Sequence, residues 1–220
     1  MVQINRFKIV EGNQVLEIHG QSRLGYNHSD GIEFYEVDDV IAHNGFYKGN
    51  IIIFFDYDTG EVYSPFELKQ NVVYSQVIYI NRLYYFIQCD FTERKVNAIE
   101  YYPGRQPKIY HSLNLDDVEL YNLMIMDTDL KIVSHGKDFV CYYPESYMIP
   151  LESRESVISI DEDKVYINKW VEEGYDNDSN SFTNQYHYHE KLIIKDFSGN
   201  ILSEKIGYLN SYLDDELWLS

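Results

Sequence analysis

The sequence predicts an all-β protein, and three observations support this fold class. Tyrosine accounts for 22 of the 220 residues, and it suits half-buried strands because its ring packs while its hydroxyl stays in water. Short apolar runs that end in Gly, Pro, Asn or Asp turns recur along the whole chain. Helical character is limited to residues 116–121, for which the sequence predicts a single helical turn.

One kind of hairpin consists of an apolar strand, an aromatic or acidic residue, a short turn and a second strand. In these turns Gly supplies a positive φ and Pro holds φ near its turn value. In chain order the copies are 7–18, which is degenerate, then 51–60, 98–104, 139–145 and 192–199.

A second kind of hairpin has an apolar strand that ends at an acidic or Asn turn. The strand that follows is rich in Tyr, Val, Ile and Leu, as a pleated strand favours. Its copies are 40–47, 77–84, 123–130, 157–165 and 212–219. Five copies of each hairpin predict twenty strands.

The order of the hairpins predicts that the chain closes on itself. It begins with a lone hairpin of the first kind, alternates the two kinds, and ends with a lone hairpin of the second kind. This order resembles the β-propeller superfamily, in which four-stranded blades circle an axis and the two chain ends often share one blade. No Trp-Asp, kelch or Asp-box signature repeats, so the resemblance names no specific family. A β-sandwich and an open array of hairpins are the alternatives.

The resemblance implies one domain over residues 1–220, a small five-bladed propeller of four-stranded antiparallel blades. Each blade would average about 44 residues, which fits a four-stranded repeat. The expected blades are 32–68, 72–114, 120–152 and 156–207, with a fifth shared between 1–20 and 208–220. The two ends are therefore expected to pair.

The net charge of −18 narrows the choice of partners. Nucleic acid and anionic membranes are poor partners, because affinity for phosphate depends on Lys and Arg. A basic protein, a cation or a neutral ligand such as a sugar fits this charge, which also serves solubility.

The chain is expected to be a cytoplasmic monomer. No basic segment followed by an apolar run is found at the amino terminus, and no later stretch approaches the length of a membrane span. Cys89 and Cys141 lack metal-type spacing, so both are expected to be reduced core residues.

Two unusually long connections predict where a site lies. They span 21–31 and 170–190, and analogy with propellers places such connections on the face where the central channel opens. They are expected to converge across the shared blade. The predicted binding face consists of Arg23, Tyr26, His28, Asp30, Glu172, Glu173, Tyr175, Asp176 and Asp178.

The second connection begins like a calcium loop, with oxygen ligands in Asp176-x-Asp178-x-Asn180. The match fails further on, because Ser181 stands where the loop needs Gly and His187 where it needs a bidentate Glu. A solvated polar loop is the simpler interpretation.

The motif His187-x-His189 would place both imidazoles on one face of a strand. It would bind zinc if a third ligand such as Glu190, His28 or Asp30 came close. An exposed strand edge explains the motif more simply, so neither a metal nor another cofactor is expected.

Carboxylates are too numerous to single out a catalytic pair. Five-bladed propellers include glycosidases whose acid and base line the axial pocket, and Tyr-rich surfaces suit stacking on sugars. No Ser nucleophile elbow, phosphate-binding Gly loop or repeated Cys-His motif is found. The candidate carboxylates are Asp30, Asp38, Asp39, Asp116, Asp117, Glu172 and Glu173.

Together these features favour a non-catalytic propeller that presents an acidic, Tyr-rich loop face to a protein partner. A narrower version is an immunity or neutralising protein that masks a basic toxin or nuclease. A carbohydrate-binding or glycoside-hydrolysing propeller is the alternative, and a protein with no separable biochemical role is the third possibility.

Overall fold

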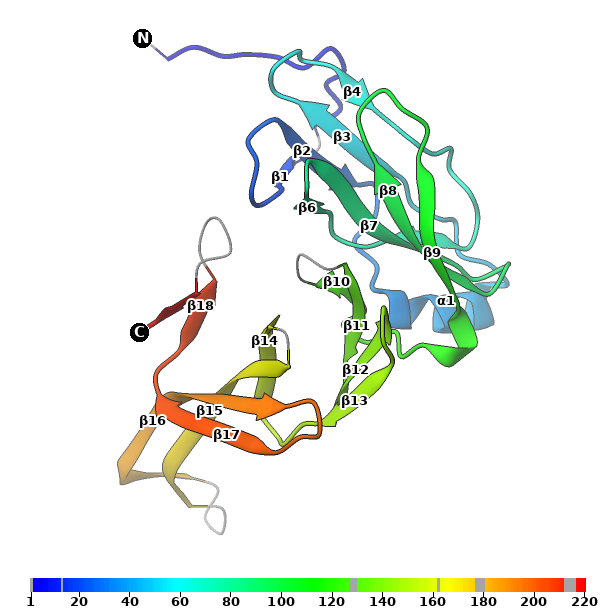
Figure 1. The fold of residues 1–220 in the computed structure, drawn as a ribbon. Helices are drawn as coiled ribbons and strands as arrows, with labels where there is room; N and C mark the ends of the chain where they lie inside the picture. The colour runs from blue at the N-terminus through cyan, green and yellow to red at the C-terminus, as the bar shows by residue number, and fades with distance from the viewer. Residues whose placement is uncertain (1, 13, 127–129, 162, 177–180, 212–216) are drawn as a thin grey trace. The chain divides into compact units, whose positions relative to one another are not determined.

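The computed structural model confirms the all-β class (Figure 1). It describes residues 2–12, 14–126, 130–161, 163–176, 181–211 and 217–220. In that part of the chain the helical elements are one α-helix and two 3-10 turns, and no helix has the length and apolar character to cross a bilayer. The chain forms two compact units, residues 1–134 and 135–220.

The first sheet of unit 1 is antiparallel and follows chain order. Its strands are β1 (Leu16–Glu17), β2 (Leu24–His28), β3 (Ile52–Asp56) and β4 (Val62–Tyr63). All five residues of β3 are buried, so this strand carries core side chains on both faces. The β3–β4 hairpin confirms the predicted copy at 51–60.

The second sheet of unit 1 is built around β7, which pairs with three neighbours. Its strands are β5 (Val72–Tyr74), β6 (Ile78–Ile80), β7 (Leu83–Asp90), β8 (Lys95–Tyr101) and β9 (Lys108–Asn114). Asn81 and Arg82 both have positive φ, which suits the two-residue turn between β6 and β7. Residues 72–114 therefore form one antiparallel sheet at the predicted bounds, but with five strands where four were expected, because β6 adds a second short strand beside β7.

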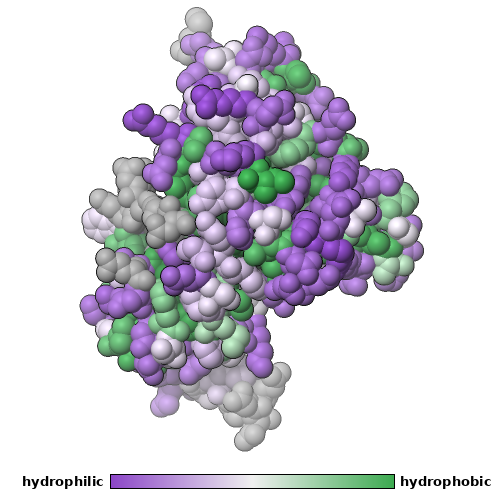
Figure 2. Space-filling model, turned by 45° about the vertical axis from the view of Figure 1, so that its right-hand side comes forward, coloured by the Kyte–Doolittle hydropathy of each residue, from purple (hydrophilic) through white to green (hydrophobic). Residues whose placement is uncertain are grey.

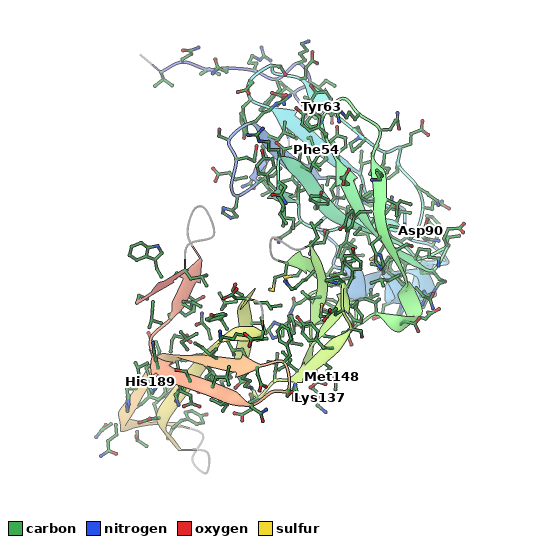
Figure 3. All side chains as sticks on the ribbon, in the orientation of Figure 1. Phe54, Tyr63, Asp90, Lys137, Met148 and His189 are labelled. Atoms are coloured by element: carbon green, nitrogen blue, oxygen red, sulfur yellow. The ribbon has the colours of Figure 1, made fainter. Side chains whose placement is uncertain are left out.

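The core of unit 1 gathers around Phe54 of β3, which Figure 3 labels. Its ring centroid lies 4.8 Å from that of Tyr101, 6.0 Å from Phe86 and 6.2 Å from Tyr84. These partners come from β7 and β8, so aromatic side chains join the two sheets. Tyr84 and Phe86 of β7 are therefore buried packing residues of this core.

The predicted strand hairpin at 40–47 is wrong, because this segment forms helix α1 (Val37–Asn44). Turn η1 (Phe34–Glu36) precedes the helix, with a capping box between Glu33 and Glu36. Gly45, with φ 82°, ends the helix. Its N–H group donates a hydrogen bond of 2.8 Å to the carbonyl oxygen of Ile41. A short apolar run alone does not distinguish a strand from a helix.

Two other local expectations meet different outcomes. The degenerate copy at 7–18 is wrong in its first part, because residues 7–10 form no strand, whereas Leu16 and Glu17 form β1 as expected. The Phe7 ring packs against Phe55 and Tyr57, with centroids 5.2 and 5.3 Å away. The helical turn expected at 116–121 exists as the 3-10 turn η2 (Leu115–Asp117), which begins one residue earlier and is shorter.

Residues 120–152 supply two hairpins near the division between the units. The first is β10 (Met124–Met126) with β11 (Lys131–His135), and the second is β12 (Asp138–Tyr143) with β13 (Tyr147–Pro150). Both follow the predicted hairpin positions. Cys89 and Cys141 are buried, as expected, and burial raises the pKa of the Cys89 thiol.

Unit 2 contains a four-stranded antiparallel sheet in chain order, which matches the group predicted at 156–207. Its strands are β14 (Glu155–Asp161), β15 (Lys164–Asp176), β16 (Ser181–Asp196) and β17 (Ile201–Ile206). Inside the unit, Lys195 and Glu155 form a buried ion pair with a nitrogen–oxygen distance of 2.7 Å.

The hairpin of β18 (Leu209–Ser211) and β19 (Leu217–Leu219) is held to β15 by a buried amide. Asn168 donates to the carbonyl of Leu209 and accepts from its N–H, both at 2.9 Å. The predicted turn at 212–216 lies outside the described residues. The predicted pairing of 1–20 with 208–220 joins the two units and stays a prediction.

Candidate functional site

The two segments expected to be long loops are largely strands. Residues 21–31 contain β2, and residues 170–190 form the ends of β15 and β16. Tyr alternates with His in Tyr186-His187-Tyr188-His189, and this pattern supports an extended strand despite the low hydrophobicity. The predicted convergence of the two segments joins the two units and stays a prediction.

The first segment lines a pocket of about 410 Å³ within unit 1. Three predicted binding-face residues, Tyr26, His28 and Asp30, contribute to its wall. Apolar and aromatic side chains supply most of the remaining lining, with a few polar groups among them, as is usual for small-molecule sites. The other lining residues include Leu16, Glu33, Phe34, Tyr74, Gln76 and Met124.

Polar atoms beside this pocket are buried without partners among the described residues. Nε2 of His28, which lines the pocket, is one of them, and the side-chain oxygen of Asn50, whose amide nitrogen lies 3.3 Å from the carbonyl oxygen of Asp30, is another. Burial lowers the pKa of His28, although a hydrogen bond to the Ser75 backbone offsets part of this effect. Burial, and then the negative charge of Asp30, raise the pKa of Tyr47. These groups make the pocket chemically specific.

Arg23 of the predicted binding face has a partner within unit 1. Its Nε and Nη2 atoms donate to Asp56 at 3.0 and 2.8 Å, and the Asp56 side chain is fully buried. The Arg23 guanidinium also lies 5.9 Å from the ring centroid of Tyr102. This arginine therefore holds the turn between β3 and β4.

The second segment forms a two-stranded ribbon in unit 2, which we call the distal ribbon (Figure 1). It comprises residues 170–176 of β15 and 181–190 of β16. Strand pairing with the outer strands β14 and β17 ends at Lys169 and Lys191, and the last backbone hydrogen bonds on these two sides join Trp170 to Arg154 and Glu190 to Gly207. Beyond Trp170 and Glu190, the described residues of β15 and β16 pair only with each other. Both faces of the ribbon are open to solvent.

One face of the ribbon, the aromatic face, presents large exposed rings. Trp170, Phe182 and Tyr188 are 42%, 68% and 65% exposed. The Trp170 and Tyr188 rings meet edge to face at 5.9 Å, and the Arg154 guanidinium lies 5.3 Å from the Trp170 centroid. Such aromatic and arginine side chains are typical anchors of protein interfaces.

Glu172 is held at the centre of this face. Arg154 donates to its carboxylate, and the hydroxyl of Tyr186 donates to its Oε1 at 2.9 Å. The bond from Arg154, followed by the bond from Tyr186, lowers the pKa of Glu172. The ring of Tyr186 continues the face through Phe182 at 4.4 Å, which in turn contacts Tyr175 at 5.4 Å.

The opposite face carries Glu173, His187 and His189, the last of which Figure 3 labels. Glu173 pairs directly with His187 across the two strands, and its Oε2 lies 3.1 Å from Nε2 of His187. Of the third ligands considered from the sequence, Glu190 is wrong, because it pairs with Trp170 and so points to the aromatic face. Glu173 takes that place instead.

The remaining candidate carboxylates have separate structural roles. Asp38 and Asp116 share Arg94, and Asp117 accepts a hydrogen bond from Asn114 at 3.1 Å. Asp39 is an exposed residue of the first turn of α1. Asp176 ends β15, while Asp178 and Asn180 lie outside the described residues, so the calcium-like motif stays a prediction.

The face of the molecule in Figure 2 is mainly hydrophilic, with hydrophobic side chains in small groups.

The placement of Glu173 beside the histidines was the feature that sequence reasoning missed. A count of the strand register across the 170–190 hairpin would have found it only with the bulge at Gly174 included.

No protein-family model, curated protein or solved structure matches this chain.

Proposed function

We propose that this protein binds a basic protein partner through the aromatic face of the distal ribbon, without catalysing a reaction. The observation that carries the proposal is a solvent-exposed cluster of Trp170, Tyr188 and Phe182 on a ribbon that projects past its sheet neighbours. Exposed aromatic clusters of this kind mark interaction surfaces, because a large ring left in water gains free energy when a partner covers it.

The charge of this segment supports a basic partner. Residues 170–190 contain no Lys or Arg. Their carboxylates are Glu172, Glu173, Asp176, Asp178 and Glu190. A cationic partner would be steered toward such a segment, and the steering would weaken as salt screens the charges. The narrower version, an immunity or neutralising protein that masks a basic toxin or nuclease, rests on this same charge.

The proposal includes the five-bladed propeller as the arrangement of the whole chain in a cytoplasmic monomer. Antiparallel hairpins at most of the predicted positions support this arrangement, although the hairpin predicted at 40–47 is helix α1 and the strand predicted from Phe7 onward is absent. The blade boundaries change at the amino terminus, because β1 pairs with β2 and so belongs to the first sheet.

A two-step experiment tests the basic partner. Proteins captured by the full chain at low salt are identified, released at high salt, and purified for binding measurements. Replacing Trp170 with alanine is expected to weaken binding about thirtyfold, since a hot-spot aromatic contributes about 2 kcal/mol or more. The matched control is Trp218→Ala, which changes an exposed tryptophan on β19 and is expected to leave binding within about twofold.

Two outcomes would contradict the proposal. The first is a partner that is not basic or whose binding is insensitive to salt. The second is an equal loss of binding in the Trp170 and Trp218 variants, which would show that the aromatic face has no special role.

The pocket of unit 1 favours a second function, the binding of a small neutral ligand such as a sugar. Tyr26, Phe34 and Tyr74 offer ring faces for stacking, while His28 and Asp30 offer polar groups. A glycan array and a panel of chromogenic glycosides test this candidate, with His28→Ala as the variant and His43→Ala, on exposed α1, as the control. Silence in both assays removes it.

A further inference from the structure

We propose that Glu173, His187 and His189 form a binding site for a zinc ion on the face of the distal ribbon opposite the aromatic face. Their ligand atoms all lie within 4.8 Å of one another. Two imidazole nitrogens and one carboxylate oxygen are a donor set that suits Zn²⁺, whereas Ca²⁺ and Mg²⁺ require oxygen ligands throughout.

Strand geometry brings the three side chains together. Glu173 and His187 are direct cross-strand partners, and His189 is two residues further along β16, opposite Val171. All three therefore point to the same side of the ribbon. The imidazoles of His187 and His189 lie nearly parallel, 20° apart with centroids separated by 6.3 Å.

The spacing of one ligand pair already fits tetrahedral coordination. Two ligand atoms about 2.0 to 2.1 Å from a tetrahedral zinc ion lie roughly 3.3 Å apart. The distance of 3.1 Å between Nε2 of His187 and Oε2 of Glu173 is close to this value. Three protein ligands leave one position for water.

His187 is already oriented as a metal ligand. Its Nδ1 lies 3.0 Å from the carbonyl oxygen of Gln185, and the tautomer with a proton on Nδ1 donates to that oxygen. Nε2 then directs its lone pair toward the carboxylate of Glu173, an arrangement that a cation between them stabilises. A backbone carbonyl commonly fixes metal-bound histidine in this way.

An irregularity in the strand pairing follows Glu173 directly, with the extra residues on β16. The register of the two strands shifts between Glu173 and Tyr175, where Gly174 adopts a φ of 76°. A Cβ on Gly174 would lie 2.6 Å from backbone atoms of Gln185, so only glycine fits. Bulges of this kind often re-aim a side chain beside a functional site.

The charges around the three ligands favour a cation. The nearest lysines on this face are Lys169 and Lys191, and both already pair with carboxylates. Lys169 contacts Glu152 and Glu155, while Lys191 contacts Glu204 at 3.0 Å. These carboxylates therefore offset the positive charge of the two lysines near the site.

Zinc titration of the full chain by calorimetry, in a buffer that does not chelate metals, tests the site. One ion per chain is expected to bind. His187→Ala, His189→Ala and Glu173→Gln are each expected to weaken binding at least about tenfold, because each removes one ligand. The matched controls are Glu172→Gln, on the opposite face, and His43→Ala in α1, and both are expected to keep the wild-type affinity.

Cobalt(II) provides a second readout, because a tetrahedral nitrogen and oxygen site gives it intense visible absorption. The absorption should appear in the wild type and vanish in the His187 variant. Excess Ca²⁺ or Mg²⁺ should not displace zinc. Absence of binding, equal binding by wild type and all three ligand variants, or displacement by Ca²⁺ would each overturn the proposal. Retained binding of the basic partner by the His187 variant would separate this site from the proposed function.

Discussion

Replacing Asp56 with asparagine tests how the turn after β3 is stabilised. The carboxylate is fully buried and accepts two hydrogen bonds from Arg23, at 3.0 and 2.8 Å. It also accepts the backbone N–H groups of Asp58 and Thr59 at 3.0 and 3.1 Å. Asparagine has nearly the same size, but if its oxygen keeps the turn bonds, its amide N–H group faces the guanidinium of Arg23.

The expected loss follows from these contacts. Removing one partner of a buried ion pair costs about 3 to 5 kcal/mol, because the other charge is left uncompensated. The Arg23 side chain is 37% exposed, so water takes over part of its solvation. We therefore expect the free energy of unfolding of unit 1 to fall by about 2 to 3 kcal/mol, with the exposed Asp58→Asn as a control that changes it little.

The effect should depend on pH. Burial raises the pKa of Asp56, but the bonds from Arg23 and the turn outweigh burial and lower it below the ordinary value of 3.8. The stabilisation is therefore complete above the unfolded-state pKa and is lost as pH falls through the lower folded-state pKa. The gap in stability between wild type and Asp56→Asn should narrow below about pH 4.

Urea unfolding followed by near-ultraviolet circular dichroism of tyrosine measures this change. Both tryptophans, Trp170 and Trp218, belong to unit 2, so their fluorescence reports that unit separately. A loss below about 0.5 kcal/mol at neutral pH, or a gap that persists unchanged at pH 3, would refute the reasoning.

Two further changes concern the carboxyl-terminal hairpin. Asn168→Ala leaves both backbone groups of Leu209 without their amide partner, and it is expected to lower the free energy of unfolding by about 2 to 4 kcal/mol. Hydrogen exchange should rise at 209–211. Unchanged exchange there would contradict the role assigned to Asn168. Deleting residues 217–220 exposes β18 whatever the overall arrangement, because β18 pairs with β19. If the five-bladed ring is closed, the deletion should also raise hydrogen exchange in residues 14–18, and unaltered protection in that segment would reject the closure.

Hairpins were the part of the fold that could be predicted, because turn chemistry and short apolar runs are local properties. The 77–84 and 192–199 segments fold as expected, with Asn81 and Gly199 at positive φ in their turns. Helix α1 was missed because its apolar run is as short as a strand, and its start depends on the Glu33 and Glu36 side chains acting together.

The candidate site was predictable only in part. Tyr26, His28 and Asp30 were predicted as binding residues because their segment is an unusually long connection, and all three line the pocket. Other lining residues come from β5, β6 and the segment before β10, and no sequence pattern links these residues to the first three. Arg23 was chosen for the same reason, yet its charge is used by Asp56, a contact between residues 33 positions apart.

The distal ribbon shows which features follow from the sequence and which follow only from the tertiary structure. The sequence by itself determined that residues 170–190 are acidic, aromatic and marked by a His-x-His motif, since these are properties of composition and spacing. Only the tertiary structure decided which side chains share a face. Beside Gly174, which alone stands opposite residues 183–186, the register of β15 against β16 shifts, and a shift by an odd number of residues moves a side chain to the other face. Glu173 therefore lies beside His187 and His189, while Glu172 lies with the aromatic rings.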